Sequence, residues 1–305
     1  MAYFIGIDGG GTKTAFVLGN EKGEILATTT LGGSSYMEIG VIGVVNLLMS
    51  GIKAILSEEN ITLFDCDSIC IGLPCYGENK NKDQEITVKL TEILKPCKVT
   101  IVNDAVVGAA GALQSDIGIH LVAGTGSIAV GFDGSGKTVR CGGFSEIFGD
   151  EGSCYWVGKK VMEVFSKEAD GRLPKGPLYD LIYKEFSLQE DFEFIGLVTD
   201  TIFPHRDKVA ALQKIALEAA LQGDANAIRI YKEAAEELAL IILGVKKQLQ
   251  FSEYPIPVSY LGGLFHASQF VLPTLKTLIE KENCVLVEAK GSAVEGALLL
   301  AIKNR

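Results

Sequence analysis

One pattern of residues occurs twice in this chain, and it constrains the fold more than any other feature. In the first copy an apolar run ends in Asp8, three glycines and two threonines, and a second apolar run follows at once. Residues 118–130 repeat this succession, with Gly124 matching Gly11 at a distance of 113 positions. At this distance the following residues also match: Thr12 with Thr125, Thr14 with Ser127, Val17 with Val130, Asn20 with Asp133 and Gly23 with Gly136. The repeat predicts a duplicated domain.

Each copy predicts a strand, a tight turn and a second strand. Glycine allows the backbone to approach a ligand closely, and consecutive N–H groups in such a turn form an anion-binding concavity. A carboxylate beside the turn would repel phosphate unless Mg2+ lies between them, so Asp8 favours a metal–nucleotide. The alternative is a glycine-rich hairpin without a ligand, and two matched turns make that alternative weaker.

The remainder of the chain alternates strands and helices. Apolar periodicity predicts strands over residues 68–73, 99–102, 257–260 and 284–288, and helices over 38–60, 85–94, 105–113, 224–250, 268–282 and 292–303. We therefore expect an α/β protein with mixed sheets flanked by helices. The predicted domains are residues 1–113, joined by the helix 292–305, and residues 114–291 with a helical insertion over 155–250, the two meeting across a cleft.

Composition excludes several classes of function. Of the 305 residues, 48% are hydrophobic and 22% are charged, and the net charge is −10 without a basic cluster. We expect a globular protein that binds neither nucleic acid nor an anionic membrane. No signal peptide is recognised, and the strongest apolar run, residues 238–243, is too short to span a membrane. These observations predict a cytoplasmic protein.

Seven cysteines form an odd count in a chain without a recognised export signal, which predicts reduced thiols. Cys66, Cys70 and Cys75 lie close together in sequence but lack the CxxC spacing of a metal site. Cys70 also lies in an apolar segment, where cysteine acts as a small hydrophobic residue. A cysteine–metal site is the less favoured interpretation.

Residues 131–138 match the P-loop pattern GxxxxGK[ST] in full. A working P-loop needs a helix that begins at its Lys-Thr, because the helix N-terminus helps to bind phosphate. The residues that follow, Val139 to Phe144, include two glycines and do not favour a helix. The repeat aligns this segment with the turn at residues 19–23, so we predict a hairpin turn.

The combined pattern resembles the actin–hexokinase–heat-shock-ATPase superfamily, and within it the BadF/BadG/BcrA/BcrD ATPase family on the N-acetylglucosamine kinase side. The resemblance covers nearly the whole chain and is most specific at residues 6–14, 103–105, 123–127 and 142–153. It implies two ribonuclease-H-like domains of the actin–hexokinase type. It also implies transfer of the γ-phosphate of ATP to a hydroxyl, O6 by preference, of an amino sugar such as N-acetylglucosamine or N-acetylmuramic acid, in a homodimer.

The resemblance assigns roles to individual residues. Asp8 would hold Mg2+, and Asp104 would be the general base, a role compatible with capping the helix 105–113. The residues implied for ATP are Gly10, Gly11, Thr12, Lys13, Gly124, Thr125, Gly262 and Gly263. The residues implied for the sugar are Ser34, Gly126, Ser127, Gly143, Phe144 and Asp150.

Three positions depart from the family pattern and leave the sugar open. Ser34 and Phe144 stand where acetylglucosamine kinases tend to carry Asn and Trp, and residues 72–75 read Gly-Leu-Pro-Cys instead of Gly-Leu-Ala-Gly. Smaller side chains would admit a larger substituent at C3, as in N-acetylmuramic acid, or another hexosamine. Two alternatives remain: an activating ATPase of a CoA-ester dehydratase with a shared [4Fe–4S] cluster, and a non-catalytic nucleotide or sugar sensor.

Overall fold

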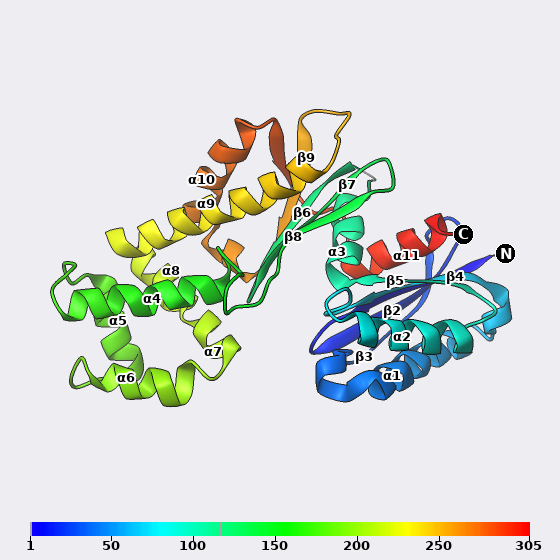
Figure 1. The fold of residues 1–305 in the computed structure, drawn as a ribbon, viewed down its shortest axis with the longest axis horizontal. Helices are drawn as coiled ribbons and strands as arrows, with labels where there is room; N and C mark the ends of the chain where they lie inside the picture. Colours follow the sequence, from blue (N-terminus) through cyan, green and yellow to red (C-terminus); the bar gives the residue numbers. More distant parts are fainter. Residues whose placement is uncertain (1, 116) are drawn as a thin grey trace. The chain divides into compact units, whose positions relative to one another are not determined.

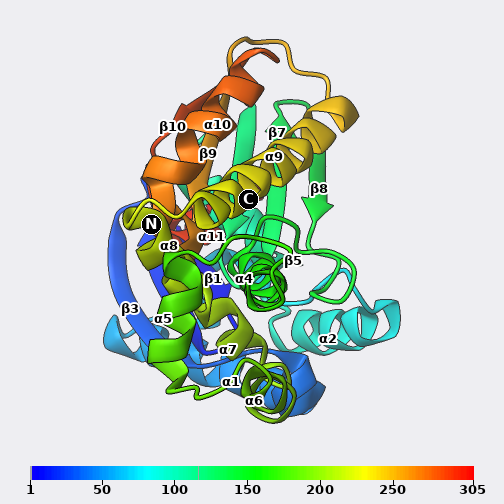
Figure 2. The ribbon, with the colours of Figure 1, turned by 90° about the vertical axis from the view of Figure 1, so that its left-hand side faces the viewer.

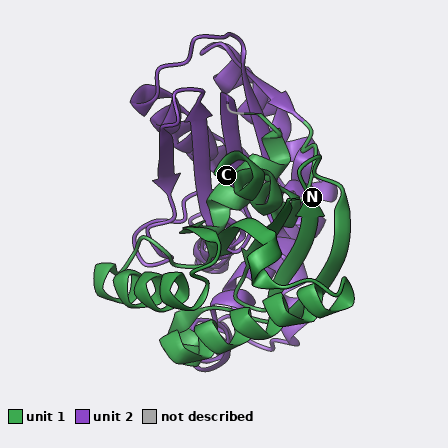
Figure 3. Ribbon diagram, turned by 90° about the vertical axis from the view of Figure 1, so that its right-hand side faces the viewer, with its two compact units in different colours: residues 1–116, 288–305 green, residues 117–287 purple. Residues whose placement is uncertain are grey.

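The computed structural model describes residues 2–115 and 117–305. The chain divides into two compact units, drawn in different colours in Figure 3. Unit 1 contains residues 1–116 and 288–305, and unit 2 contains residues 117–287. The C-terminal segment therefore returns to the unit in which the chain begins.

Each unit contains a five-stranded sheet with helices packed against it (Figure 1). The elements of unit 1 are β1 Tyr3–Gly9, β2 Lys13–Asn20, β3 Ile25–Gly32, α1 Tyr36–Glu58, η1 Leu63–Asp65, β4 Cys66–Leu73, α2 Lys80–Ile93, β5 Lys98–Asn103, α3 Asp104–Leu113 and α11 Ala293–Lys303. The strands of unit 2 are β6 Ile117–Ala123, β7 Ser127–Asp133, β8 Thr138–Gly142, β9 Ile256–Leu261 and β10 Cys284–Val287. Its helices are α4 Cys154–Ala169, α5 Pro177–Phe186, α6 Glu193–Leu197, η2 Val198–Ile202, α7 Arg206–Ala211, α8 Gln213–Leu221, α9 Ala225–Gln248, η3 Gly263–Ala267 and α10 Ser268–Glu280.

The two sheets have the same topology, which confirms the duplication. Their strand orders are β3-β2-β1-β4-β5 and β8-β7-β6-β9-β10, and in each sheet the first three strands are antiparallel and the last three parallel. In unit 1 the turn lies between the paired residues Gly9 and Thr14, and in unit 2 between Ala123 and Ser127. The second turn is thus one residue shorter, and Val122 occupies the position equivalent to Asp8.

The P-loop match is a hairpin turn, as predicted. β7 ends at Asp133 and β8 begins at Thr138, and the two strands are antiparallel. The Asp133 carboxylate accepts hydrogen bonds from the backbone N–H of Ser135, at 3.0 Å, and from its hydroxyl, at 2.6 Å. Asn20 has the equivalent role in the first copy, where its side-chain oxygen accepts a bond from the N–H of Lys22 at 2.9 Å. The strand β8 itself was not predicted.

Alternating side chains of β1 divide the core of unit 1 into two layers. Ile5 and Ile7 belong to the layer that includes α1 and α2, whereas Phe4 belongs to the layer formed with α3 and α11. Gly6 lies against α11, because a Cβ on it would be 2.4 Å from the Leu298 nitrogen. The C-terminal helix is therefore part of the core of unit 1.

The sequence prediction that the strongest apolar segment is residues 238–243, too short to span a membrane, is wrong. Among the described residues, α1 is one helix long and apolar enough to cross a membrane by length and composition. Its apolar positions form a stripe, and Val44, Leu48, Ile52 and Ile55 on this stripe are buried in the core of unit 1. This packing is that of a core helix.

In unit 2 the long helix α9 packs against the sheet (Figure 2). The first residue of the predicted range 224–250 is its cap, since Asp224 accepts bonds from the N–H groups of Asn226 and Ala227. Gly131 of β7 provides room for the helix, since a Cβ there would lie 2.4 Å from Val245. The remaining helices, α4 to α8, continue the same core away from the sheet.

Glu168 is a fully buried acid in this helical region. One carboxylate oxygen accepts a bond from the Asn226 amide at 2.8 Å, and the other has no hydrogen-bond partner among the described residues. Burial raises the pKa of Glu168 to about 7, and the charges of Asp224 and Asp180 add to the rise. The folded protein therefore holds this proton more tightly than the unfolded chain, in which the pKa is about 4.5.

We expect Glu168→Gln to change the pH dependence of stability. The free energy of unfolding of the wild type should fall as pH rises from about 4.5 to about 7, since the folded state must lose its buried proton. The Gln variant lacks this proton, so it should equal the wild type at pH 5 and exceed it by about 1–3 kcal/mol at pH 8. Urea denaturation at the two pH values measures the difference. Glu236→Gln, at an exposed position of α9, is the control and should follow the wild type.

Candidate functional site

The first glycine turn, residues 10–13, is held by hydrogen bonds and close packing on one side and is exposed to solvent on the other. The Gly10 N–H donates to the Lys13 carbonyl at 2.9 Å, and the Ser34 N–H donates to the Gly10 carbonyl at 2.9 Å. A Cβ on Gly33 would lie 1.9 Å from the Gly11 carbonyl oxygen, so only glycine fits there. Gly11, Thr12 and Lys13 themselves are exposed, and their N–H groups are accessible to an anion.

Two carboxylates lie near this turn, at the C-terminal ends of β1 and β5, the two strands that flank β4. Asp8 is paired with Gly72 of β4, and Leu73 is paired with Asn103, which immediately precedes Asp104. Burial and, to a smaller extent, the charge of Asp104 raise the pKa of Asp8 and Lys13 lowers it in part, so that the pKa is about 6. The carboxylates of Asp8 and Asp104 are thus close enough to repel each other, in surroundings from which water is partly excluded.

Asp104 is the first residue of α3 and not its cap. The cap is Asn103, whose side-chain oxygen accepts a bond from the Ala105 N–H at 3.1 Å. The Asp104 carboxylate also accepts from this N–H, at 2.9 Å, and its side chain is half-buried. The capping role considered for Asp104 therefore belongs chiefly to Asn103.

Ser34 is a buried polar residue beside the same strand end. Its hydroxyl is buried and has no hydrogen-bond partner among the described residues. A Cβ on Gly9 would lie 2.4 Å from this hydroxyl, so Gly9 leaves the space that Ser34 occupies. An unpartnered hydroxyl costs about 1–3 kcal/mol unless another group bonds to it.

The unit 1 site fits a magnesium ion. Mg2+ prefers oxygen ligands, uses only one or two protein carboxylates and completes its shell with water and phosphate oxygens. Within the described part of the chain no three His, Cys, Asp or Glu side chains gather as a metal cluster, so the protein contributes at most a pair here. A divalent cation would relieve the repulsion between Asp8 and Asp104.

The second glycine turn, residues 124–126, is fixed by its neighbours in unit 2. The Gly124 N–H donates to the Gly126 carbonyl at 2.9 Å, and the Cys154 N–H at the start of α4 donates to the Gly124 carbonyl at 2.8 Å. Thr125 is exposed. Gly262, with φ of 125°, packs against this turn, because a Cβ on it would lie 2.3 Å from the Ala123 carbonyl oxygen. Glycine at 262 is thus required by packing within the protein.

Asp150 is held at the second turn by two donors. It is 2% exposed and adopts the left-handed backbone conformation, with φ of 57°. One carboxylate oxygen accepts the Ser127 N–H at 3.1 Å, and the other forms an ion pair and hydrogen bond with Arg206. A Cβ on Gly126 would lie 2.7 Å from both Asp150 and Arg206, which explains the glycine.

The other residues predicted to bind sugar lie on the same side of unit 2. The Gly143 N–H donates to the Ser127 carbonyl at 2.8 Å, and the Ser127 hydroxyl is already bonded to the Glu151 carbonyl at 2.6 Å. Phe144 is 66% exposed, so unit 2 does not pack around its ring. Gly263, predicted to approach the nucleotide, is not crowded, since a Cβ on it would lie 3.7 Å from the Cys154 sulfur, an ordinary contact.

The structure therefore gathers the predicted residues into two groups. Unit 1 brings together Asp8, Asp104, Ser34 and the turn Gly10, Gly11, Thr12 and Lys13. Unit 2 brings together the turn Gly124, Thr125 and Gly126 with Ser127, Gly143, Asp150 and Gly262. Sequence reasoning missed Arg206, because an arginine at the start of a short helix has no motif around it.

None of the seven cysteines, all of which lie among the described residues, forms a disulfide. Cys66 and Cys97 are neighbours, and the hydrogen bond between them raises the pKa of Cys66. Cys70 lies in the other core layer, against α3 and α11, and burial raises its pKa to about 12. Such thiols behave as core residues at neutral pH.

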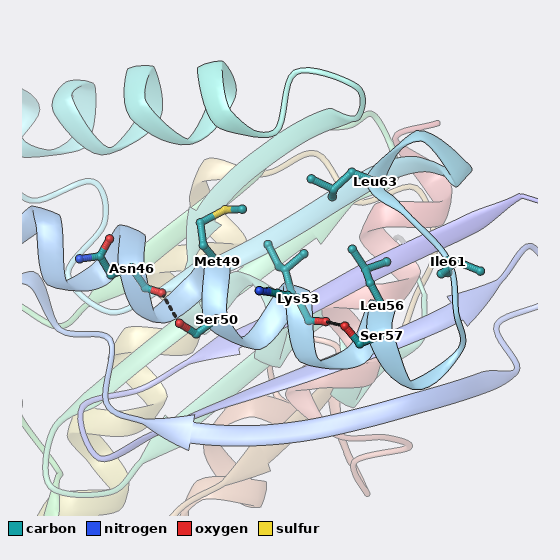
Figure 4. Close-up of a pocket in the computed structure, with 9 residues that line it drawn as sticks. Asn46, Met49, Ser50, Lys53, Leu56, Ser57, Ile61 and Leu63 are labelled. Atoms are coloured by element: carbon teal, nitrogen blue, oxygen red, sulfur yellow. Dashed lines mark hydrogen bonds between the residues drawn. The ribbon is translucent and has the colours of Figure 1, made fainter.

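A groove of about 540 Å³ along α1 lies apart from the predicted residues (Figure 4). It is lined by Asn46, Met49, Ser50, Ile52, Lys53, Leu56, Ser57, Ile61 and Leu63. The hydroxyls of Ser50 and Ser57 donate to the carbonyls of Asn46 and Lys53 in their own helix. None of the predicted site residues lines it, so the candidate site rests on the turns and acids.

Two equivalent five-stranded sheets, each with a glycine–threonine turn after its first strand, define a protein of the ribonuclease-H-like, actin–hexokinase type. The chain belongs to the BadF/BadG/BcrA/BcrD ATPase family, which it matches over residues 5–301. It is 28% identical over 304 residues to an N-acetylmuramic acid/N-acetylglucosamine kinase of Clostridium acetobutylicum, covering 99% of this chain and 98% of that protein. It is 30% identical over 315 residues to an N-acetyl-D-glucosamine kinase of Dictyostelium discoideum, with the same coverage.

Solved structures show the same fold. A candidate N-acetylglucosamine kinase from Chromobacterium violaceum superposes with a TM-score of 0.74 at 24% identity, covering 98% of this chain and 99% of that one. This likeness supports the fold predicted from the sequence, two domains of the actin–hexokinase type.

Proposed function

We propose that this protein is an ATP-dependent kinase that transfers the γ-phosphate to a hydroxyl, O6 by preference, of an amino sugar. N-acetylglucosamine and N-acetylmuramic acid are the substrates that the relatives favour. The observation that carries the proposal is the closeness of Asp8 and Asp104 beside an exposed glycine turn. Phosphoryl transfer needs mainly positioning and charge stabilisation, and these groups would supply both.

The phosphate groups of ATP would bind to the backbone N–H groups of Gly11, Thr12, Lys13 and Thr125. Gly10 and Gly124 would shape the two turns, since their own N–H groups donate to the carbonyls of Lys13 and Gly126. Asp8 would hold Mg2+, which when bound would neutralise charge on the transferred phosphate. The backbones of Gly262 and Gly263 would contact the adenosine, and Gly262 also packs against residue 123, where a side chain would not fit.

Asp104 would accept the proton of the attacking hydroxyl. It lies at the start of α3, beside Asp8, and its side chain is half-buried. The sugar would be bound by Ser34, with its unpartnered hydroxyl, and by the unit 2 group of Gly126, Ser127, Gly143, Phe144 and Asp150. We further propose that the protein is a cytoplasmic homodimer.

We expect Mg2+-dependent nucleotide binding to depend on the ionisation of Asp8. A carboxylate must be deprotonated to bind a metal, and the pKa of Asp8 is about 6. The apparent affinity for Mg2+–ADP should therefore weaken by about tenfold per pH unit below pH 6 and stay constant above about pH 7. Calorimetric titrations between pH 5 and 8 measure this. In Asp8→Asn the phosphate groups of ADP still titrate, but the pH dependence of affinity that comes from Asp8 should be lost. The same dependence of affinity on pH in the variant and the wild type would contradict the metal role.

A sugar panel tests the proposed function. ADP release with ATP and Mg2+ should depend on added sugar, and at least one of N-acetylglucosamine, N-acetylmuramic acid, glucosamine and glucose should be turned over. NMR of the product should place the phosphoester on C6. Sugar-independent ATP hydrolysis with an oxygen-sensitive brown iron cluster would support the activating-ATPase alternative. Binding of ATP and sugar without any ADP formation would support a sensor, and either result would refute the kinase.

A further inference from the structure

Arg206 contacts the candidate sugar-binding acid from a different part of unit 2. It is the first residue of α7, in the helical region, whereas Asp150 lies in the loop before α4. Its guanidinium forms an ion pair with Asp150 and lies 3.4 Å from the Glu146 carboxylate. The Arg206 side chain is 45% exposed, while that of Asp150 is 3% exposed. In this ion pair the Asp150 side chain is therefore buried, whereas the Arg206 side chain reaches solvent.

The backbone of Arg206 has a rigid support. α7 packs against α4 so closely that a Cβ on Gly158 would lie 1.9 Å from the Val209 carbonyl oxygen. Val209 is fully buried. The N-terminus of α4 also donates a hydrogen bond to the second glycine turn. Helix α4 therefore supports both α7, which carries Arg206, and the turn beside which Asp150 lies. A side chain held from a packed helix fixes its partner more firmly than one on a free loop.

The two oxygens of Asp150 are held by different donors. The Ser127 N–H bonds one oxygen, and the Arg206 guanidinium bonds the other, so the carboxylate cannot rotate without losing one of them. The remaining lone pairs are left at fixed directions. Without Arg206 the Asp150 carboxylate would lose one of these two restraints. The loop that carries Asp150 also contains Glu146 and Glu151, and no charge from Arg206 would then offset the repulsion among these acids.

We propose that Arg206 is a positioning residue for the sugar, which acts by fixing the orientation of the Asp150 carboxylate. This inference rests on the proposed function, in which Asp150 binds sugar hydroxyls. Arg206 touches neither reacting atom in this account. Its loss should therefore weaken sugar binding more than it slows phosphate transfer, and nucleotide binding should be unaffected.

Steady-state kinetics of Arg206→Gln and Arg206→Lys test the proposal. The KM for the sugar should rise by about 10- to 100-fold in the Gln variant, as expected for the loss of a charged hydrogen bond. The Lys variant should recover part of the loss, because it keeps the charge but not the paired donors. The KM for ATP should stay within about twofold. Arg172→Gln, which removes an arginine from an exposed pair with Asp170, is the matched control and should resemble the wild type.

A double variant separates positioning from a merely structural role. If Arg206 acts through Asp150, Asp150→Asn with Arg206→Gln should bind sugar no more weakly than Asp150→Asn alone. Additive losses, or an unchanged sugar KM in Arg206→Gln, would overturn the inference, as would a lower kcat with unchanged KM. Calorimetric titration with N-acetylglucosamine provides a readout independent of turnover. If the wild type neither binds nor phosphorylates any sugar, the proposed function itself fails.

Discussion

Asp104→Asn is expected to lower the kcat of sugar phosphorylation by about 10²- to 10⁴-fold. The amide has nearly the same shape as the carboxylate but cannot accept the proton of the attacking hydroxyl. Since Asn103 caps α3, the helix should remain intact in this variant. The KM values for sugar and ATP should therefore change by only a few fold, as measured by sugar-dependent ADP release with each substrate varied in turn while the other is saturating.

A second acid at a helix start provides the control. Asp180 lies in the first turn of α5 and is exposed, far along the chain from the glycine turns. Asp180→Asn should keep wild-type kcat. Full activity in Asp104→Asn would exclude this residue as the base, and an equal loss in both variants would show that the effect is not specific.

Gly296→Ala is expected to destabilise unit 1 by several kcal/mol. α3 and α11 cross so closely that a Cβ on Gly296 would lie 2.0 Å from the Val107 carbonyl oxygen and 2.3 Å from the Gly111 nitrogen. Gly111 has the reciprocal constraint, with its Cβ position 1.9 Å from the Ser292 carbonyl oxygen. A methyl group must push the helices apart and loosen the core layer around Phe4, an overpacking cost of about 1–3 kcal/mol or more.

The same substitution elsewhere should have the opposite sign. Gly196 lies in the helix α6, and a Cβ on it would meet nothing within 4 Å. Gly196→Ala should be neutral or stabilise the protein by about 0.5–1 kcal/mol, because alanine restricts the unfolded chain. Urea denaturation of both variants measures the contrast. A wild-type midpoint for Gly296→Ala would contradict the close crossing of α3 and α11.

Patterns that repeat along the chain allowed much of the fold to be predicted. The glycine turns, the strands around them and the helix α9 were recognised because local residue types determine them. β8 was missed, since its residues follow a glycine-rich turn and precede another glycine-rich segment. The 23-residue α1 was predicted as a helix, but its overall apolar character was overlooked because single glycines and polar residues interrupt the run.

The candidate site was less predictable than the fold. Asp8 and Asp104 could be recognised from turn chemistry and from the resemblance, but their mutual effect on the pKa of Asp8 depends on strand pairing. Gly262 was predicted to approach a ligand, and the sequence did not indicate that its missing side chain also makes room for the protein's own backbone. Arg206 lies 56 positions from Asp150, and no local pattern connects residues at such a separation.

The position of α11 has a consequence for how the protein is made. The ribosome releases the chain from its N-terminus, and the strands of unit 1 are all complete by residue 103. Unit 2 is a continuous segment and can fold as soon as it emerges. Unit 1 must wait for residues 293–303, and until then only α3 covers part of the layer that contains Phe4, Val17 and Cys70. The part of the protein that is translated first is therefore the last to be finished, and a nascent chain exposes that apolar face to chaperones throughout the synthesis of unit 2.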